Sequence, residues 1–286
     1  MVQSILVTGA NKGLGFEAVR LLSAAFPRAT IFLGTRSIAN GEKALAKLRA
    51  ESLGRHVQVL EIDVADVNSI KHASEEIRAT TQSLDVLINN AAILLPTANP
   101  EDIKAVLDVN LFGLKNVIDA FLLLMPSAAT IINVYSEIGA GVHYRLPQDL
   151  QQVLENINTL SWTQIEALAN DYQSTQPQYA WHSNGTVHSY GASKVLMNAF
   201  SRLLANDQPD LRVFAVCPGY CDTDMNGHAG FRSPVAGAFS IVWPLLNIGL
   251  SSGLFYRDGQ PLPFSSVKMA ETEGGNTPDP NDEYWY

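Results

Sequence analysis

The chain has 286 residues, of which 47% are hydrophobic and 16% charged, so it is long enough to bury one large hydrophobic core. Its formal net charge of -9 at pH 7 argues against nucleic acid or an anionic membrane as a partner, because the overall field repels both. We predict one domain over residues 1–264, followed over 265–286 by an acidic tail that contains Gly and Pro and runs along the surface.

We expect no export signal, no metal site and no membrane span. The opening MVQSILVTGA has no basic region and no long apolar run, so it predicts a strand and a cytoplasmic protein. Cys217 and Cys221 have no further ligands at a suitable spacing, and we interpret them as reduced thiols. The apolar stretch 235–250 contains Pro244 and falls short of the ~20 residues of a membrane helix, so it predicts a buried or pocket-covering helix.

Short apolar runs rich in β-branched residues alternate with segments of helical periodicity along the chain. The runs predict strands at roughly 2–8, 29–35, 56–62, 84–89, 129–135 and 211–217. This alternation favours an α/β protein with a Rossmann-type, doubly wound parallel sheet and helices on both faces. Ligands bind such sheets beyond the carboxyl ends of the strands, so the residues that directly follow each strand are the candidates for a site.

The first predicted strand leads into the glycine-rich segment TGANKGLG, residues 8–15, and then into an amphipathic helix. Glycines suit this place because the turn is tight and because a Cβ would keep the backbone away from a diphosphate. The free amide groups at the start of the helix would bind that diphosphate. The segment therefore predicts a dinucleotide-binding loop; a plain structural turn is the alternative.

The end of the second strand distinguishes the two nicotinamide cofactors. An acidic residue there would bind the ribose 2′-hydroxyl of NAD, whereas an arginine accepts the 2′-phosphate of NADP. The position holds Arg36, and Lys12 of the glycine loop is expected to reach the same phosphate. The sequence therefore predicts NADPH/NADP+, with two solvated surface cations as the alternative.

The segment 140–187 is longer than a plain connection, and LPQDLQQVLENI and SWTQIEALANDYQ within it predict two helices. It would wall a substrate pocket or cover a surface that otherwise self-associates. Tyr190 and Lys194 follow, four residues apart and therefore on one face of a helix. An adjacent ammonium lowers the pKa of a phenol, so the pair predicts a proton donor and the group that adjusts it. By spacing alone, a surface Tyr and Lys is the favoured interpretation.

Seven motifs together resemble the short-chain dehydrogenase/reductases in order and approximate spacing, over residues 4–264. They are TGANKGLG, Asp63 after the third strand, LINNAA, Asn110 in DVNLFG, INVYSEIG, YGASK and CPGYCDTDM. Within that family the chain is most similar to the NADPH-dependent carbonyl reductases, because of ANKG in the glycine loop, the long insertion, CPGYCDTDM and the closing SGLFYRDGQPLPF.

The resemblance implies the catalytic roles. Ser136 would hydrogen-bond the carbonyl oxygen of a small-molecule substrate and Tyr190 would protonate it. Lys194 would bind the nicotinamide ribose and lower the pKa of Tyr190, and Asn110 would hold a water molecule in a proton relay. The implied reaction is the NADPH-dependent reduction of an aldehyde, ketone or quinone, with the cofactor carrying the hydride.

The resemblance also implies a set of cofactor-binding residues. Those around the diphosphate and the adenosine ribose would be Gly9, Asn11, Lys12, Gly13, Leu14 and Gly15. Those at the adenine would be Asp63 and Val64, and Asn90 would lie at the ribose side. Those at the nicotinamide would be Pro218, Gly219 and Thr223, and the catalytic Tyr190 and Lys194 would contact the cofactor as well.

Three positions depart from the family pattern. Ala92 stands where the family has a glycine, Tyr135 replaces the first of two serines, and Cys221 replaces an aliphatic residue beside the nicotinamide loop. None of the three removes a catalytic group, and we interpret Cys221 as a small buried hydrophobic residue rather than a reactive thiol.

Two other classes of function compete with the reductase. A non-catalytic dinucleotide-binding sensor or scaffold would not need Ser136, Tyr190 and Lys194, yet the chain has all three. A nucleotide-sugar epimerase or dehydratase shares the Tyr and Lys pair but has a different glycine spacing and a larger C-terminal substrate domain than the residues after CPGYC provide.

The sequence does not name the substrate, and the pocket residues should come from 138–187 and 224–250. Their aromatic side chains suggest an apolar ligand: Tyr144, Trp162, Trp181, Phe231 and Trp243. We also expect a monomer, because Ser136 and Tyr190 are 190 − 136 = 54 positions apart, much further than in oligomeric relatives. The extra residues would cover the outer helical face through which those relatives associate.

Overall fold

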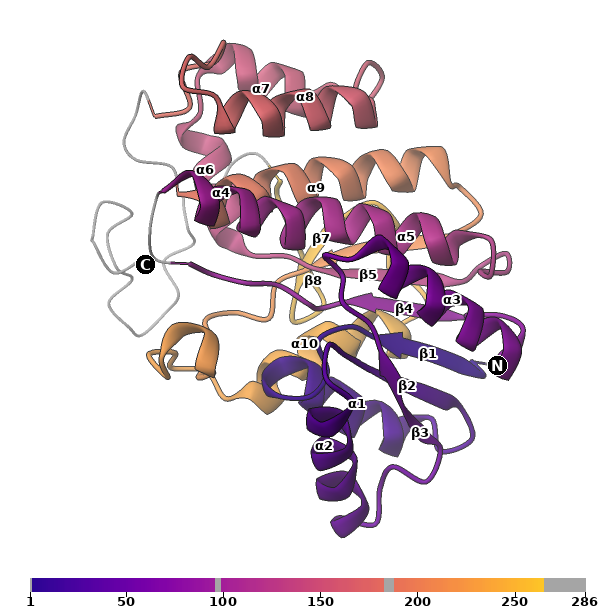
Figure 1. Ribbon diagram of the computed structural model, residues 1–286. Coiled ribbons are helices and arrows are strands. Elements are labelled where there is room, and N and C mark those ends of the chain that lie inside the picture. The colour runs from indigo at the N-terminus through magenta and orange to yellow at the C-terminus, as the bar shows by residue number, and fades with distance from the viewer. Residues whose placement is uncertain (1, 96–98, 183–187, 265–286) are drawn as a thin grey trace.

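The computed structural model describes residues 2–95, 99–182 and 188–264. Its centre is an eight-stranded sheet with the strand order β3-β2-β1-β4-β5-β6-β7-β8 (Figure 1). The six strands predicted from the sequence are all present, as β1 (Ser4–Val7), β2 (Thr30–Thr35), β3 (Val57–Glu61), β4 (Val86–Asn89), β5 (Thr130–Val134) and β6 (Arg212–Val216). Two short strands follow them, β7 (Phe255–Arg257) and β8 (Gln260–Leu262). All pairings are parallel except that between β7 and β8.

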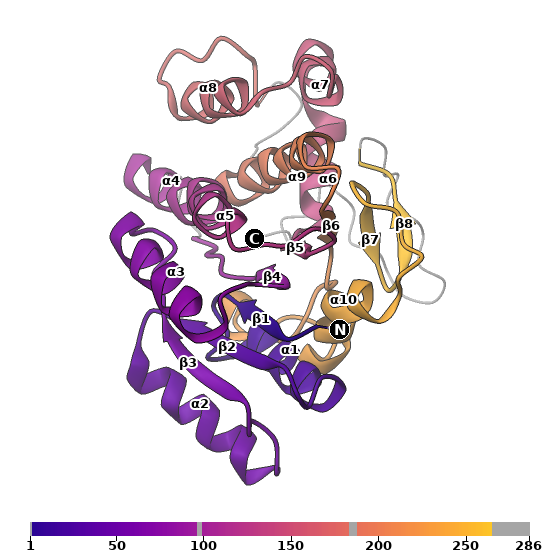
Figure 2. The same cartoon turned by 90° about the vertical axis from the view of Figure 1, so that its right-hand side faces the viewer.

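Both faces of β1, β2, β4, β5 and β6 are buried, which explains why these strands are almost continuously apolar. On β1, Leu6 points into one core while Ile5 and Val7 point into the other. One core lies under α1 (Gly13–Ala25), α2 (Ile38–Ala50) and α10 (Pro234–Leu246). The other lies under α3 (Val67–Thr81), α4 (Pro100–Leu107), α5 (Leu114–Leu122) and α9 (Ser189–Asp207). The doubly wound α/β fold expected from the sequence is thereby confirmed (Figure 2).

The hairpin of β7 and β8 extends the sheet beyond the predicted strands, next to β6 (Figure 2). Its turn is Asp258-Gly259, with φ of 52° and 76°. The left-handed conformation suits Gly259, and Asp is among the residues that tolerate it. Two ion pairs run from this hairpin: Arg257 to Glu137 at 2.7 Å, and Asp258 to Arg232.

The insertion forms α6 (Glu137–Arg145), α7 (Gln148–Glu155) and α8 (Trp162–Gln173), so the two predicted helices are confirmed and α6 is an addition. The insertion lies outside α9, and α8 packs on α9 and α4 (Figure 1). Trp162 fits between Phe112 and Phe200, with ring centroids 6.0 and 5.2 Å away.

Two aromatic residues assigned to the substrate pocket therefore belong to the core instead. Trp162 joins α8 to α9, and Trp181 is 2% exposed, packs on Tyr172 and donates its indole N–H to Asp171 at 2.9 Å. The expectation was wrong for both, because the insertion needs large apolar side chains to bury its own face. Tyr144 and Phe231 are exposed, at 60% and 87%.

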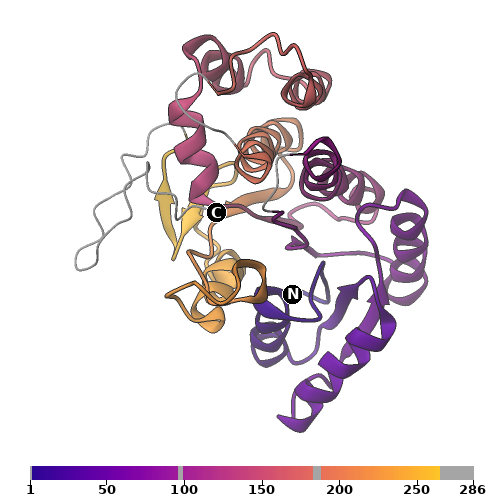
Figure 3. The same ribbon diagram turned by 60° about the vertical axis from the view of Figure 1, so that its left-hand side comes forward.

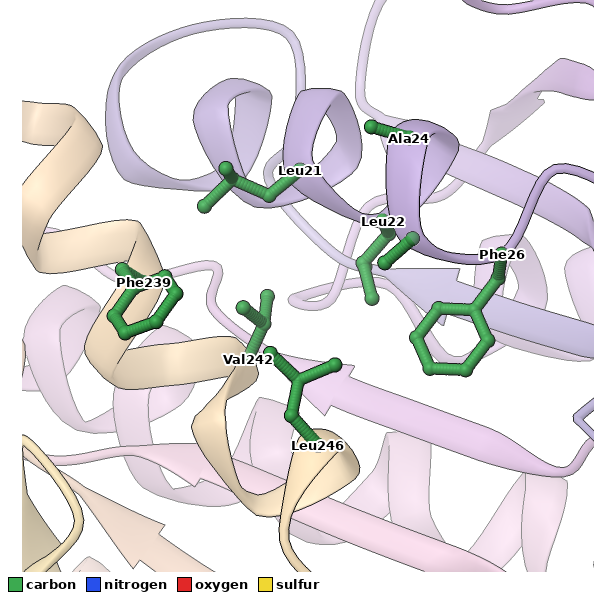
Figure 4. Close-up of a pocket in the computed structure, with 8 residues that line it drawn as sticks. Leu21, Leu22, Ala24, Phe26, Phe239, Val242 and Leu246 are labelled. Atoms are coloured by element: carbon green, nitrogen blue, oxygen red, sulfur yellow. The ribbon is translucent and has the colours of Figure 1, made fainter.

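The helix expected over 235–250 is α10, which lies beside α1 (Figure 3). A hollow of about 320 Å³ opens between the C-terminal halves of the two helices (Figure 4). Its lining is apolar throughout: Leu21, Leu22, Ala24, Ala25, Phe26, Phe239, Val242 and Leu246. Such a hollow offers no acid, base or nucleophile, so it is not the site of the predicted chemistry.

Among the described residues, none of the helices combines the length and the apolar character needed to cross a bilayer. Within the same ranges no three His, Cys, Asp or Glu side chains gather in a way that would bind a metal ion. The predicted tail over 265–286 lies outside the described residues.

Candidate active site

The turn between β1 and α1 has the tight geometry that the glycine motif predicts. Gly9 and Gly13 have φ of 63° and 56°, a region that favours glycine. A Cβ on Gly9 would lie 2.9 Å from the Cα of Ala91, and a Cβ on Gly15 would lie 2.5 Å from both the Asn90 amide nitrogen and the Gly9 oxygen. The side chain of Lys12, the N-cap residue, makes no capping hydrogen bond to α1. The start of α1 thus keeps amide donors for an anion.

Asn90 holds this loop from the end of β4. Its side-chain nitrogen donates to the carbonyl oxygens of Thr8 and Gly9 at 2.9 and 3.1 Å. The hydroxyl of Thr8 in turn accepts from the backbone N–H groups of Asn90 and Ala91, both at 3.1 Å. Asn90 therefore shapes the glycine loop, and its predicted contact with the ribose stays a prediction.

The residues after β2 and β3 lie at the same edge of the sheet. Thr35 is buried at the end of β2, and Arg36 directly after it is exposed to solvent. Asp63 follows β3 and accepts from the backbone N–H of Ala65 at 3.0 Å, while Val64 is buried. The structure thus leaves the arginine, rather than an acidic residue, at the end of β2.

Lys12 and Arg36 were expected to converge on one phosphate, but the structure gives Lys12 a different partner. The Lys12 ammonium lies 2.8 Å from a carboxylate oxygen of Asp224, in the loop that follows β6. Opposite charge on the facing loop attracts the ammonium. The sequence did not reveal this pairing, because the partner lies 212 residues away.

The loop after β6 borders the glycine loop from the other side. Gly219 has φ of 78°, and a Cβ on Gly13 would touch the methyl group of Thr223 at 3.8 Å. Cys221 is buried and its thiol donates to the carbonyl oxygen of Pro218 at 3.2 Å. Burial raises the pKa of this thiol to about 11, which agrees with a small buried residue rather than a nucleophile.

Ser136 and Tyr190 meet at the carboxyl end of β5, although 54 positions separate them in the sequence (190 − 136). Ser136 lies two residues after the strand and caps α6, where its hydroxyl accepts from the N–H of Ile138 at 3.3 Å. The same side chain hydrogen-bonds the phenol of Tyr190, near the start of α9. The fold therefore brings the predicted pair of hydroxyl groups together.

Lys194 lies one turn further along α9, 2% exposed, and its ammonium donates to the carbonyl oxygen of Val134 at 2.9 Å. Burial lowers the pKa of this amine to about 8. Burial also raises the pKa of the Tyr190 phenol above its usual value, and the hydrogen bond from Ser136 offsets only part of that effect. The expected lowering of the Tyr190 pKa was wrong for this structure, because desolvation outweighs the attraction of an amine that is itself buried and turned toward Val134.

Asn110 lies in a π-helical turn, η1 (Asp108–Gly113), of a kind that often occurs at functional sites. Its side-chain nitrogen donates to the oxygen of Ile93 at 3.0 Å and to the Ser193 hydroxyl at 3.1 Å, and its oxygen accepts from the N–H of Ile93 at 2.9 Å. The Ser193 hydroxyl in turn donates to the backbone carbonyl oxygen of Tyr190 at 2.7 Å. Asn110 thus joins the loop after β4 to α9.

Two features of the site were missed at the level of sequence. Ser193 belongs to the YGASK motif, and its place next to Lys194 was the signal that could have found it. Tyr135, which replaces a serine of the family pattern, is buried against Gly139, where a Cβ would lie 2.3 Å from the tyrosine oxygen. The glycine in α6 therefore makes room for the larger side chain.

The chain matches a known protein family over most of its length. The short chain dehydrogenase family matches residues 3–147 and 178–231. The interval between the two matched segments, 148–177, contains α7 and α8, so the core of the insertion is what the family pattern lacks.

Individual relatives include carbonyl reductase (NADPH) 1 of Sus scrofa, 31% identical over 83% of this chain and 85% of the relative. The (+)-neomenthol dehydrogenase of Capsicum annuum is 28% identical over 88% of this chain and 95% of the relative. Among solved structures, salutaridine reductase from Papaver somniferum is similar with a TM-score of 0.80 and 25% identity, over 89% of this chain and 99% of that one.

Proposed function

Because the chain belongs to the short-chain dehydrogenase family, we propose that it reduces the carbonyl group of a small molecule with NADPH, and that Tyr190 supplies the proton. The chain is an oxidoreductase of the carbonyl-reductase-like group, and NADP(H) is its cofactor. The observation that carries the finer proposal is the meeting of Ser136, Tyr190 and Lys194 at the carboxyl end of β5, at the same edge of the sheet as the glycine loop after β1.

The residues present fit this cofactor. Gly9, Gly13 and Gly15 form a turn that a Cβ would fill or strain, next to the uncapped start of α1. Arg36 at the end of β2 would bind the 2′-phosphate. Its side chain is exposed to solvent, so it could bind the phosphate without any change in the packing of the core. Asp63 and Val64 would border the adenine, and Pro218, Gly219 and Thr223 the nicotinamide.

NADPH, when bound, supplies the hydride. Ser136 would donate a hydrogen bond to the substrate carbonyl oxygen, on which negative charge develops. Tyr190 would then give its phenolic proton to that oxygen, and the raised pKa keeps the phenol protonated at neutral pH, as a proton donor requires. Lys194 would bind the nicotinamide ribose and help to return a proton to Tyr190.

Asn110 and Ser193 would hold α9 in register with the loop after β4. The bridging water assigned to Asn110 remains a proposal. The side-chain nitrogen and oxygen of Asn110 both have partners already. Such a water molecule would therefore donate to the second lone pair of the Asn110 side-chain oxygen or to a neighbouring backbone oxygen.

A screen of aldehydes, ketones, diketones and quinones for NADPH oxidation tests the reaction. We expect turnover of at least one apolar carbonyl compound, with NADPH preferred over NADH. A protein that binds NADPH tightly and reduces none of them would favour the competing proposal, a dinucleotide-binding sensor or scaffold. The three catalytic side chains weigh against that alternative, since a sensor does not need them.

We further propose that the protein acts in the cytoplasm as a monomer, with one domain over 1–264 and the insertion over about 140–187. The support for the monomer is the position of α8 against α9 and α4, which covers the outer helical face (Figure 2).

A further inference from the structure

An ion pair crosses between the two loops that border the proposed cofactor site. Lys12 belongs to the turn between β1 and α1, and Asp224 begins η2 (Asp224–Asn226) in the loop between β6 and α10. The Lys12 nitrogen lies 2.8 Å from one carboxylate oxygen of Asp224. Thr223, next to Asp224, approaches Gly13, next to Lys12, so the loops touch along two successive residues.

The loop after β6 holds the Asp224 carboxylate in place. Thr223 and Asn226 form a reciprocal capping box around η2, and the Asn226 side chain donates to the oxygen of Cys221 at 3.0 Å. His228 lies 3.2 Å from the second carboxylate oxygen of Asp224 and 2.6 Å from Asp222. One oxygen of Asp224 therefore faces His228 and the other faces Lys12.

This ion pair has little to do with stability. The side chains of Lys12 and Asp224 are 66% and 57% exposed, and pairs this exposed contribute little to folding. Lys12 also holds the pKa of Asp224 below its usual range, so the aspartate carries its charge at neutral pH. The consequence of the ion pair is that it holds the Lys12 ammonium beside Asp224.

We propose that Asp224 is a cofactor-selectivity residue: by holding Lys12 across the site, it weakens the binding of NADPH while leaving that of NADH almost unchanged. The inference rests on the proposed function, in which Arg36 binds the 2′-phosphate of the cofactor, and on the sequence-based prediction that Lys12 reaches the same phosphate. A 2′-phosphate must either take the ammonium away from Asp224 or share it with a nearby carboxylate of the same sign. NADH has no 2′-phosphate and meets neither cost.

Calorimetric titration of NADP+ and NAD+ into purified protein, at one fixed pH and low salt, tests the proposal without relying on activity. Asp224→Asn should tighten NADP+ about 3- to 10-fold, as expected for one exposed charge contact, and change NAD+ less than about 2-fold. The matched control is Asp222→Asn, which removes the same charge two residues away but contacts His228 rather than Lys12. We expect it to leave the ratio of the two affinities unchanged.

A double-mutant cycle locates the effect at the lysine. Lys12→Met alone should weaken NADP+, and adding Asp224→Asn to it should have no further effect. The proposal is overturned if Asp224→Asn weakens NADP+, if both asparagine variants tighten the two nucleotides alike, or if Asp224→Asn keeps its effect without Lys12. Wild-type protein that binds NADP+ but reduces no carbonyl compound would refute the proposed reaction and leave this inference intact.

Discussion

Arg257→Gln should destabilise the fold beside the candidate active site by about 1–3 kcal/mol at neutral pH. Arg257 donates to the carboxylate of Glu137, the residue after Ser136, and the two side chains are 28% and 19% exposed. An exposed ion pair contributes about 0–1 kcal/mol, whereas breaking a fully buried one costs about 3–5 kcal/mol. This pair lies between those limits, because glutamine would leave a mostly buried carboxylate without its ion-pair partner.

The loss should depend on pH in a definite direction. Burial raises the pKa of Glu137 above its usual value of 4.5, and Arg257 opposes that rise, so its removal raises the pKa further. A carboxyl with a raised pKa in the folded state adds stability below its unfolded pKa, and this contribution is lost as the pH rises through the folded value. The deficit of the variant should therefore be largest at neutral pH and shrink as the pH falls toward 4.5.

Urea unfolding of the wild type and Arg257→Gln at several pH values measures this deficit. The control is Glu137→Gln combined with Arg257→Gln, which removes both charges and should recover a large part of the loss. An unfolding free energy that is unchanged at neutral pH, or a deficit that stays constant as the pH falls, would refute the reasoning.

Three further predictions concern the cofactor, the pH profile and the assembly. Arg36→Ala should weaken NADPH by ~1.5–3 kcal/mol more than NADH, and titrations that show equal losses would place the 2′-phosphate elsewhere. The pKa of about 8 for Lys194 predicts that kcat/KM for the substrate falls above pH 8 as the ammonium loses its proton, and a profile that stays flat to pH 10 would contradict it. Light scattering should give a mass near 31.1 kDa, whereas a stable dimer at micromolar concentration would exclude the monomer.

The local parts of the site could be predicted because they depend on backbone geometry and on neighbouring residues. Gly9 and Gly13 have the left-handed backbone conformation that their tight turn requires. The apolar run before Gly9 predicts the buried strand β1. The meeting of Ser136 and Tyr190 followed from the family resemblance, and the hydrogen bond between the two side chains agrees with it.

Other parts depend on contacts that sequence patterns do not carry. The strands β7 and β8 have only three residues each, too few to show a period. Gly139 and Gly141 lower the helix propensity of α6, which hid that helix. Aromatic content suggested a pocket, but Trp162 of α8 packs against Phe200 of α9, because composition does not say on which side of a helix a ring will lie.

The pKa values and the ion-pair partners were the least predictable features of the site. The expectation that Lys194 lowers the pKa of Tyr190 treated the two groups as if both were solvated. In the fold both are buried, so desolvation acts on each of them, and the Lys194 ammonium turns to the oxygen of Val134. The partner of Lys12 was likewise decided by a loop on the opposite side of the site.

The most direct test of the proposed function is the turnover of Tyr190→Phe with a carbonyl substrate found in the NADPH screen. Loss of the proton donor should lower kcat by at least ~100-fold, while the dissociation constant for NADPH stays within about 2-fold of the wild type, since the phenol is not part of the glycine loop. Near-normal turnover by this variant would contradict the central claim that Tyr190 protonates the substrate.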